Sequence, residues 1–195
     1  MPSITINLLL SIFYSRLFCK TNQQNVNGCP KLTSLPESIE HLTALQILEI
    51  GPCEELSSLP NQIGNLASLS GLAIQGCPKL MCLPESIGHL TALRTLEIRN
   101  CEGLSSLSDQ IENLVSLLCF EIQHCPKLMC LPDGISNLKM LRELEIYHCP
   151  NLQRRCEKDR REDWPKISHI PDTRIQDWQR DQDTFQRWLL YAYLH

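Results

Sequence analysis

The chain has 195 residues, 43% of them apolar, which is enough for one ordinary domain with a sizeable core. The formal net charge is −4, and residues 29–152 contain 7 Lys and Arg against 14 Asp and Glu. A surface that binds a phosphate backbone needs clustered basic residues, so this acidic middle excludes nucleic acid as its partner.

Residues 1–25 are expected to be an irregular N-terminal segment. They include an apolar run at residues 4–13 that is too short to span a bilayer. The run lacks the positively charged start and small-residue cleavage site of a signal peptide, so we favour a chain that is not secreted, with secretion as the alternative. Thr21 and Gln24 stand where a repeat starting further upstream would need Leu. No polar capping unit precedes residue 26, so we expect a fragment or truncated product of a longer array.

Residues 26–152 form a repeat whose clearest marker is a cysteine every 24 residues. These cysteines are Cys29, Cys53, Cys77, Cys101, Cys125 and Cys149. Aligned on them, Leu and Ile fall into fixed columns through about five consecutive 24-residue units. A unit this short cannot bury its own apolar face, whereas stacked units close their Leu and Ile rows into one core.

Each unit predicts one strand and one irregular or helical segment. Leu48 and Ile50 alternate with a polar residue, which indicates a short strand. Pro60 follows a Leu of the next unit and marks the start of the opposite side, because proline cannot donate a backbone hydrogen bond. The expected fold is therefore an α/β repeat, a curved solenoid with a parallel β-sheet on its concave face.

The cysteine column is expected to be a ladder of reduced interior thiols. A cysteine at the turn after each strand can pack as a hydrophobe and cap buried backbone N–H groups. A disulfide ladder between neighbouring units is the alternative. We expect no metal, because the cysteines lack the close Cys or His pairs of a zinc site.

Residues 153–195 are expected to be a closing segment and tail. Residues 154–163 mix both charges and indicate a solvated stretch, after which Trp164 and Ile167 could cover the last repeat. Beyond Pro171, apolar residues recur at loosely helical spacing. They are Ile175, Trp178, Phe185, Trp188 and Leu189. A short amphipathic helix or a disordered tail is the simpler reading, and a docking helix for a partner is the alternative.

The candidate binding residues are those that alternate with the inward Leu and Ile and so face the concave side. They are Glu49, Glu97, Arg99, Glu121, Gln123, Glu145 and Tyr147. Ala73 interrupts the row of glutamates. The row would select a basic partner with Tyr147 as an anchor, or it is a solvated feature of the repeat consensus.

The unit Leu-x-x-Leu-x-Ile-x-x-Cys-x-x-Leu-x-x-Leu-Pro-x-x-Ile-x-x-Leu resembles the leucine-rich repeats of plant nucleotide-binding disease-resistance proteins. Arg155-Cys156, followed by Asp163-Trp164-Pro165-Lys166-Ile167, resembles the closing segment of such repeat domains. The resemblance implies a cytoplasmic protein-interaction module that recognises a pathogen or host protein in defence. The nucleotide-binding loop of those receptors is missing, so no nucleotide or other cofactor is expected.

Two other functions remain as alternatives. The first is an intracellular leucine-rich-repeat signalling scaffold outside immunity. The second is an enzyme such as a ubiquitin ligase, with Cys156 as nucleophile and His169 as its base. We expect no enzyme, because a nucleophilic cysteine also needs a group that orients the base.

Overall fold

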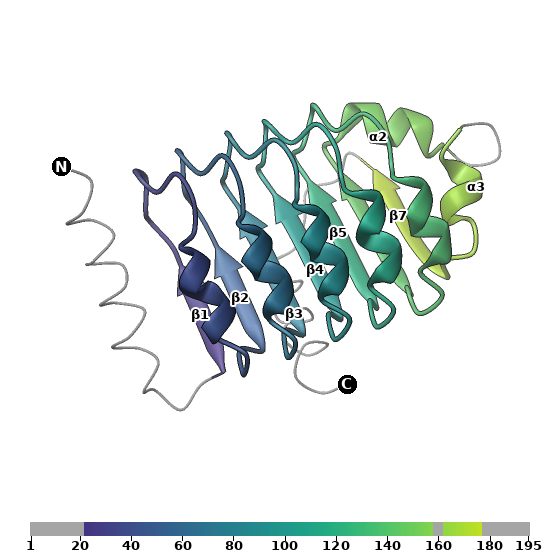
Figure 1. Ribbon diagram of the computed structural model, residues 1–195. Coiled ribbons are helices and arrows are strands. Elements are labelled where there is room, and N and C mark those ends of the chain that lie inside the picture. The colour runs from purple at the N-terminus through teal and green to yellow at the C-terminus, as the bar shows by residue number, and fades with distance from the viewer. Residues whose placement is uncertain (1–21, 158–161, 177–195) are drawn as a thin grey trace.

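The computed structural model describes residues 22–157 and 162–176, which form a single parallel sheet lined on one side by short helices (Figure 1). The sheet runs in chain order from β1 to β7. Its strands are β1 (Gln23–Val26), β2 (Ile47–Ile50), β3 (Gly71–Gln75), β4 (Thr95–Arg99), β5 (Cys119–Gln123), β6 (Glu143–Tyr147) and β7 (Asp172–Gln176). This arrangement confirms the predicted repeat solenoid with one parallel sheet. The sheet is uncurled rather than curved, and the face that we call concave is the one that points away from the core.

The segments opposite the sheet are 3-10 helices, one for each unit. They are η1 (Glu37–His41), η2 (Asn61–Asn65), η3 (Glu85–His89), η4 (Asp109–Asn113) and η5 (Asp133–Asn137). Proline precedes four of them, in an extended conformation that its ring favours. Before η4 the proline is replaced by Ser108, whose hydroxyl accepts a hydrogen bond from the Gln110 N–H at 3.2 Å. A different residue type thus begins the same helical turn.

The core lies between the sheet and the 3-10 helices and is continuous from one unit to the next. The Leu and Ile columns predicted from the repeat point into it, and most of their members are fully buried. Neighbouring strands pair in register, so Leu48 on β2 stands beside Leu72 on β3, and Ile50 beside Ile74. Because every strand is aligned in this way, the residues between the buried ones form straight rows on the opposite face.

At the N-terminal end, β1 begins at Gln23, upstream of residue 26, where the repeat was expected to start. Gln24 occupies an inward position, is buried and stands in register with Leu48. We expected residues 1–25 to be irregular, because Thr21 and Gln24 stand where Leu should be. Residues 23–25 nevertheless belong to β1, whose backbone pairs with β2 and continues the sheet although Gln24 replaces an apolar residue. Thr21 and the apolar run at residues 4–13 lie outside the described residues.

At the C-terminal end, two short helices and a last strand follow β6. They are α2 (Pro150–Arg155), α3 (Trp164–Ile167) and β7. As expected, Trp164 packs against the core and Ile167 is fully buried in it. The sequence did not predict β7, which stands in register with β6 so that Ile175 lies beside Ile146. Trp178, Phe185, Trp188 and Leu189 lie outside the described residues.

No helix in the ranges that the structure describes is long and apolar enough to cross a membrane.

Candidate functional site: the concave face of the sheet

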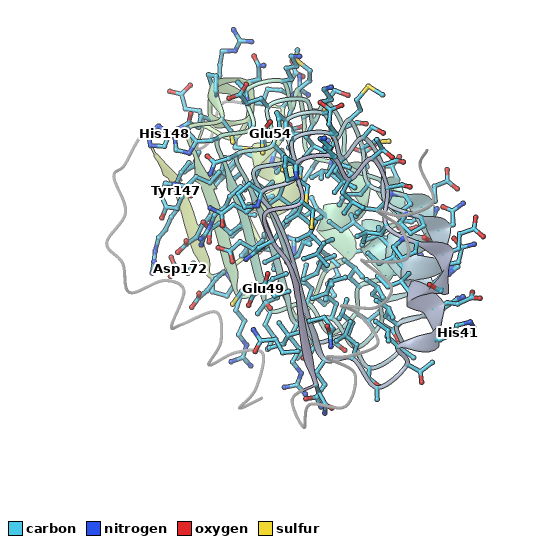
Figure 2. The ribbon with its side chains drawn as sticks, turned by 90° about the vertical axis from the view of Figure 1, so that its left-hand side faces the viewer. His41, Glu49, Glu54, Tyr147, His148 and Asp172 are labelled. Carbon is cyan, nitrogen blue, oxygen red and sulfur yellow. The ribbon has the colours of Figure 1, made fainter. Side chains whose placement is uncertain are left out.

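The predicted binding residues lie on the face of the sheet that points away from the 3-10 helices. In Figure 2, Glu49, Tyr147 and Asp172 lie on the sheet side of the molecule, and His41 of η1 lies on the opposite side. The first outward row follows the register across all seven strands. It consists of Asn25, Glu49, Ala73, Glu97, Glu121, Glu145 and Arg174. The acidic row therefore exists as predicted, and it ends in an arginine that the sequence did not reveal.

These side chains differ in exposure. Glu97, Glu121 and Glu145 are only 3%, 8% and 7% exposed, and Tyr147 is 5% exposed. Glu49, Ala73, Arg99 and Gln123 are half-buried. One of the two sequence interpretations was that the row is a solvated feature of the repeat. Glu97, Glu121 and Glu145 are too buried to be fully solvated.

Arg99 links two of the buried carboxylates. Its Nε lies 2.9 Å from Glu121 Oε1 and its second guanidinium nitrogen lies 3.0 Å from Glu121 Oε2, and it also forms an ion pair with Glu97. This bidentate geometry fixes the orientation of the Arg99 side chain as well as the position of its charge. At the end of the row, Arg174 contacts Glu145 Oε1 at 2.9 Å and Asp172 Oδ2 at 2.6 Å. Arg99 and Arg174 thus hold carboxylates on β4 to β7.

Glu49 has a different environment. Its two carboxylate oxygens accept hydrogen bonds from Gln23 Nε2 at 2.7 Å and from Asn25 Nδ2 at 2.8 Å. Both donors are neutral amides on β1, and none of the ion pairs found among the described residues includes Glu49. The carboxylate is therefore oriented by its neighbours while its negative charge is not matched by a cation in that part of the chain.

A hollow lies beside Glu49, where Ala73 interrupts the row of glutamates. It has a volume of about 50 Å³. Its lining residues are Asn27, Glu49, Ile50, Ala73, Ile74, Gln75, Glu97 and Arg99. A small apolar floor between two carboxylates can accept the end of a Lys or Arg side chain from a partner, with the methylene stem on Ala73 and the charge near Glu49.

The backbone is left-handed at the residue that directly follows each of the strands β4, β5 and β6. Asn100, His124 and His148 have φ values of 53°, 51° and 51°. The rings of His124 and His148 stack with centroids 4.3 Å apart. Burial and the neighbouring His148 lower the pKa of His124. Within the described ranges, no group of three or more His, Cys, Asp or Glu side chains is placed to hold a metal ion.

The described cysteines are all free thiols. In the column after the strands, the thiols donate to the carbonyl oxygen two residues earlier, as from Cys101 to Arg99 at 3.4 Å, except that Cys53 donates to the Val26 carbonyl oxygen at 3.7 Å. The expected capping of a backbone N–H is found at Cys149, whose sulfur accepts from the Cys125 N–H at 3.4 Å. Hydrogen bonding to Cys101 and burial raise the pKa of Cys77 to about 12. The column is therefore mainly a set of buried donors to carbonyl groups.

Cys156, the candidate nucleophile, is buried at the end of the core. Burial and the nearby charge of Asp163 raise the pKa of its thiol to about 12. A thiol in this environment stays protonated at neutral pH, whereas a nucleophilic cysteine needs a lowered pKa and an exposed sulfur. His169, proposed as its base, contacts the Leu138 carbonyl oxygen at 3.4 Å.

Two comparisons with known proteins agree with this geometry at the level of the fold. A family model described as a leucine-rich repeat region matches residues 78–160. The leucine-rich-repeat domain of the type III effector XopL is 24% identical, with 74% of this chain and 50% of that chain covered and a TM-score of 0.64. The chain thus spans half the length of that domain. No curated protein matches the sequence.

Two further solved structures match with lower TM-scores. The plant peptide hormone receptor RGFR1 in complex with RGF2 is 22% identical over 69% of this chain and 29% of the receptor, with a TM-score of 0.40. The complex PEPR1–AtPEP1 is 21% identical over 64% of this chain and 18% of that chain, with a TM-score of 0.49. The XopL domain, with a TM-score of 0.64 and 24% identity, supports the fold and nothing finer. The chain has the fold of a leucine-rich-repeat solenoid, and the part of it that matches the model of a leucine-rich repeat region is residues 78–160.

Proposed function

We propose that this chain is a protein-interaction module whose concave face binds a protein or peptide through basic side chains. The observation that carries the proposal is Glu49, a carboxylate held by two neutral amides beside the hollow at Ala73. A partner Lys or Arg would supply the charge that Glu49 lacks, and such a pre-oriented carboxylate loses little conformational entropy on binding. The other proposed contacts are Glu97, Arg99, Glu121, Gln123, Glu145 and Tyr147.

We further propose that the module is cytoplasmic and of the plant disease-resistance type, recognising a pathogen or host protein. The support is the closing segment, whose resemblance to those receptors rests on Arg155 and on residues 163–167. In the structure, Asp163 and Lys166 of this segment contact the backbone of Leu131 in the last repeat. The segment therefore has a definite structural role, which is consistent with its being a specific feature of the family.

The binding proposal is tested by measuring how strongly the chain binds immobilised peptides of equal length that are basic, neutral or acidic. Parent chain, Glu49→Gln and Ala73→Gln, which fills the hollow without adding charge, are compared, with Glu85→Gln on the exposed surface of η3 as the matched control. We expect the parent to prefer basic peptides and both concave variants to bind them about tenfold more weakly, which corresponds to roughly 1.4 kcal/mol. Equal binding by Glu49→Gln and Glu85→Gln would contradict the proposal.

A second experiment tests the cellular location of the chain and its partners there. A fluorescent fusion of the full chain expressed in plant cells should be cytoplasmic, and its cross-linked partners should be lost with Glu49→Gln. A fusion found outside the cell would contradict the cytoplasmic assignment while leaving the peptide measurement unaffected.

A further inference from the structure

The hollow at Ala73 has a different kind of charged group on each side. Glu49 on β2 lines it with a carboxylate, and Arg99 on β4 lines it with a guanidinium group. Ala73 on β3 lies between them, and the two strand spacings from β2 to β4 span about 9.6 Å. Glu97, the other acidic residue of the lining, forms an ion pair with Arg99 and is already matched by a cation. The acceptors for a partner's cation therefore lie on the Glu49 side.

The acceptors on the Glu49 side are few. Each carboxylate oxygen can accept two hydrogen bonds, and on Glu49 one oxygen accepts from Gln23 at 2.7 Å and the other from Asn25 at 2.8 Å. One acceptor position thus remains on each oxygen. The side chains of Asn27 and Gln75, which also line the hollow, have one carbonyl oxygen each. A bound cation with many donors could not satisfy all of them here.

We propose that the partner's basic side chain at this hollow is a lysine and not an arginine, a choice that rests on the proposed function of the concave face. A lysine carries its charge on one compact nitrogen with three donors, at the end of a flexible apolar stem. The stem can lie on Ala73 while the ammonium group binds Glu49. At that position the charge stays on the β2 side of the hollow, away from Arg99 on β4.

An arginine fits the same surroundings less well. Its guanidinium group holds five donors in a fixed plane and binds a carboxylate best through both oxygens at once. Both oxygens of Glu49 already accept an amide hydrogen. The far edge of the plane would also face Arg99, which has donors and no acceptor. Donors that lose water without gaining an acceptor cost free energy, so the hollow favours the more compact cation.

The experiment titrates the full chain with three peptides of equal length that differ only in one central residue, which is lysine, arginine or the neutral norleucine. The parent should bind the lysine peptide several-fold more tightly than the arginine peptide, and the norleucine peptide most weakly. In Asn25→Ala, one oxygen of Glu49 loses its amide donor, so the ratio of the two basic peptides' dissociation constants should fall toward one. Asn61→Ala on η2 removes an equally exposed asparagine and should keep the parent ratio.

The comparison of the two basic peptides uses the parent alone, so it does not depend on the folding of a variant. Equal binding of the lysine and arginine peptides, both tighter than norleucine, overturns the preference for lysine and leaves the proposed function standing. Equal binding of all three peptides contradicts the proposed function, and the preference for lysine falls with it. An unchanged ratio in Asn25→Ala also overturns the inference, because the occupied oxygens of Glu49 would then not discriminate between the two cations.

Discussion

The backbone N–H of Leu131 donates a hydrogen bond to the carboxylate of Asp163, 3.1 Å away and 32 residues later in the chain. Asp163 is fully buried and also accepts from Arg155 Nε at 3.0 Å and contacts Lys166 Nζ at 3.0 Å. Lys166 in turn donates to the Leu131 carbonyl oxygen at 2.9 Å. The last repeat is thus joined to the closing segment through both backbone groups of one residue.

Replacing Asp163 by alanine should therefore destabilise the fold strongly. The change leaves Arg155, Lys166 and the Leu131 N–H without their shared acceptor, and breaking a buried pair in this way costs about 3 kcal/mol or more. The free energy of unfolding in urea measures the effect. Glu162→Ala is the control, because Glu162 is an exposed partner of Arg155, and it should cost less than about 1 kcal/mol. Equal losses in the two variants would show that Asp163 is not the junction.

The same carboxylate predicts a loss of stability in acid. Burial opposes ionisation of Asp163, but hydrogen bonds from Arg155, Lys166 and Leu131 outweigh it and lower its pKa. The ionised group therefore stabilises the folded chain above the unfolded pKa of about 4, and this contribution is lost as the pH falls through the lower folded pKa. Unfolding curves from pH 5 to pH 2 should show a steeper loss in the parent than in Asp163→Asn. Parallel curves would contradict the assignment.

Replacing Thr95 by valine should stabilise the protein. Thr95 is fully buried, and its hydroxyl has no hydrogen-bond partner within the described part of the chain. Valine has nearly the same shape and removes the buried polar group, so the gain should be about 1 kcal/mol. Thermal unfolding of the variant measures it. A lower midpoint than that of the parent would indicate that the hydroxyl has a partner after all.

Replacing Gly88 by alanine should destabilise the array. A Cβ at Gly88 would lie 2.5 Å from the Gln110 carbonyl oxygen on the next 3-10 helix, so the two units would have to separate. Overpacking of this kind costs about 1 to 3 kcal/mol. Glu112→Ala is the matched control, since it places alanine at the same position one unit later, where a side chain is already accommodated. A gain in stability for Gly88→Ala would contradict the steric argument.

His124 predicts a second pH effect, near neutrality. Its pKa is lowered in the folded state by burial and by the stacked His148, so the unfolded chain binds the proton more readily. Stability should therefore fall as the pH drops from about 6.5, the usual His pKa, through the lower folded pKa. His124→Asn keeps a residue that tolerates the left-handed backbone and should flatten this slope. Thermal midpoints between pH 7.5 and pH 5 would test it, and an unchanged slope would contradict it.

The repeat made most of the fold predictable, because a fixed 24-residue spacing assigns each Leu and Ile to a column before any contact is known. Leu48 and Ile50 point inward and Glu49 outward, as their alternation required. Four of the five 3-10 helices also begin where proline predicted the start of the opposite side, and the fifth begins after Ser108. The strand β7 was not predictable, since Ile175 is separated from the array by the charged closing segment.

The chemistry of the candidate site was only partly predictable. The glutamate row could be read from the repeat, but its burial could not, because the exposure of a side chain depends on contacts that a column of the repeat does not reveal. The link from Arg99 to Glu121 joins residues on neighbouring strands, which the alignment places side by side. The pairing of Arg174 with Glu145 depends on β7, and no column of the repeat predicts that strand. The hollow at Ala73 could have been suspected from the missing glutamate.

Ala73 also indicates how the size of a bound group could be set in such a molecule. The hollow exists because one unit lacks the acidic side chain that its neighbours carry, and each unit occupies one strand spacing, about 4.8 Å. Inserting a second copy of the unit that contains Ala73 would widen the hollow by that amount without changing any other residue. The width of the group that fits the hollow would then change by one strand spacing for each unit. Duplicating or deleting a unit would therefore alter specificity in discrete steps.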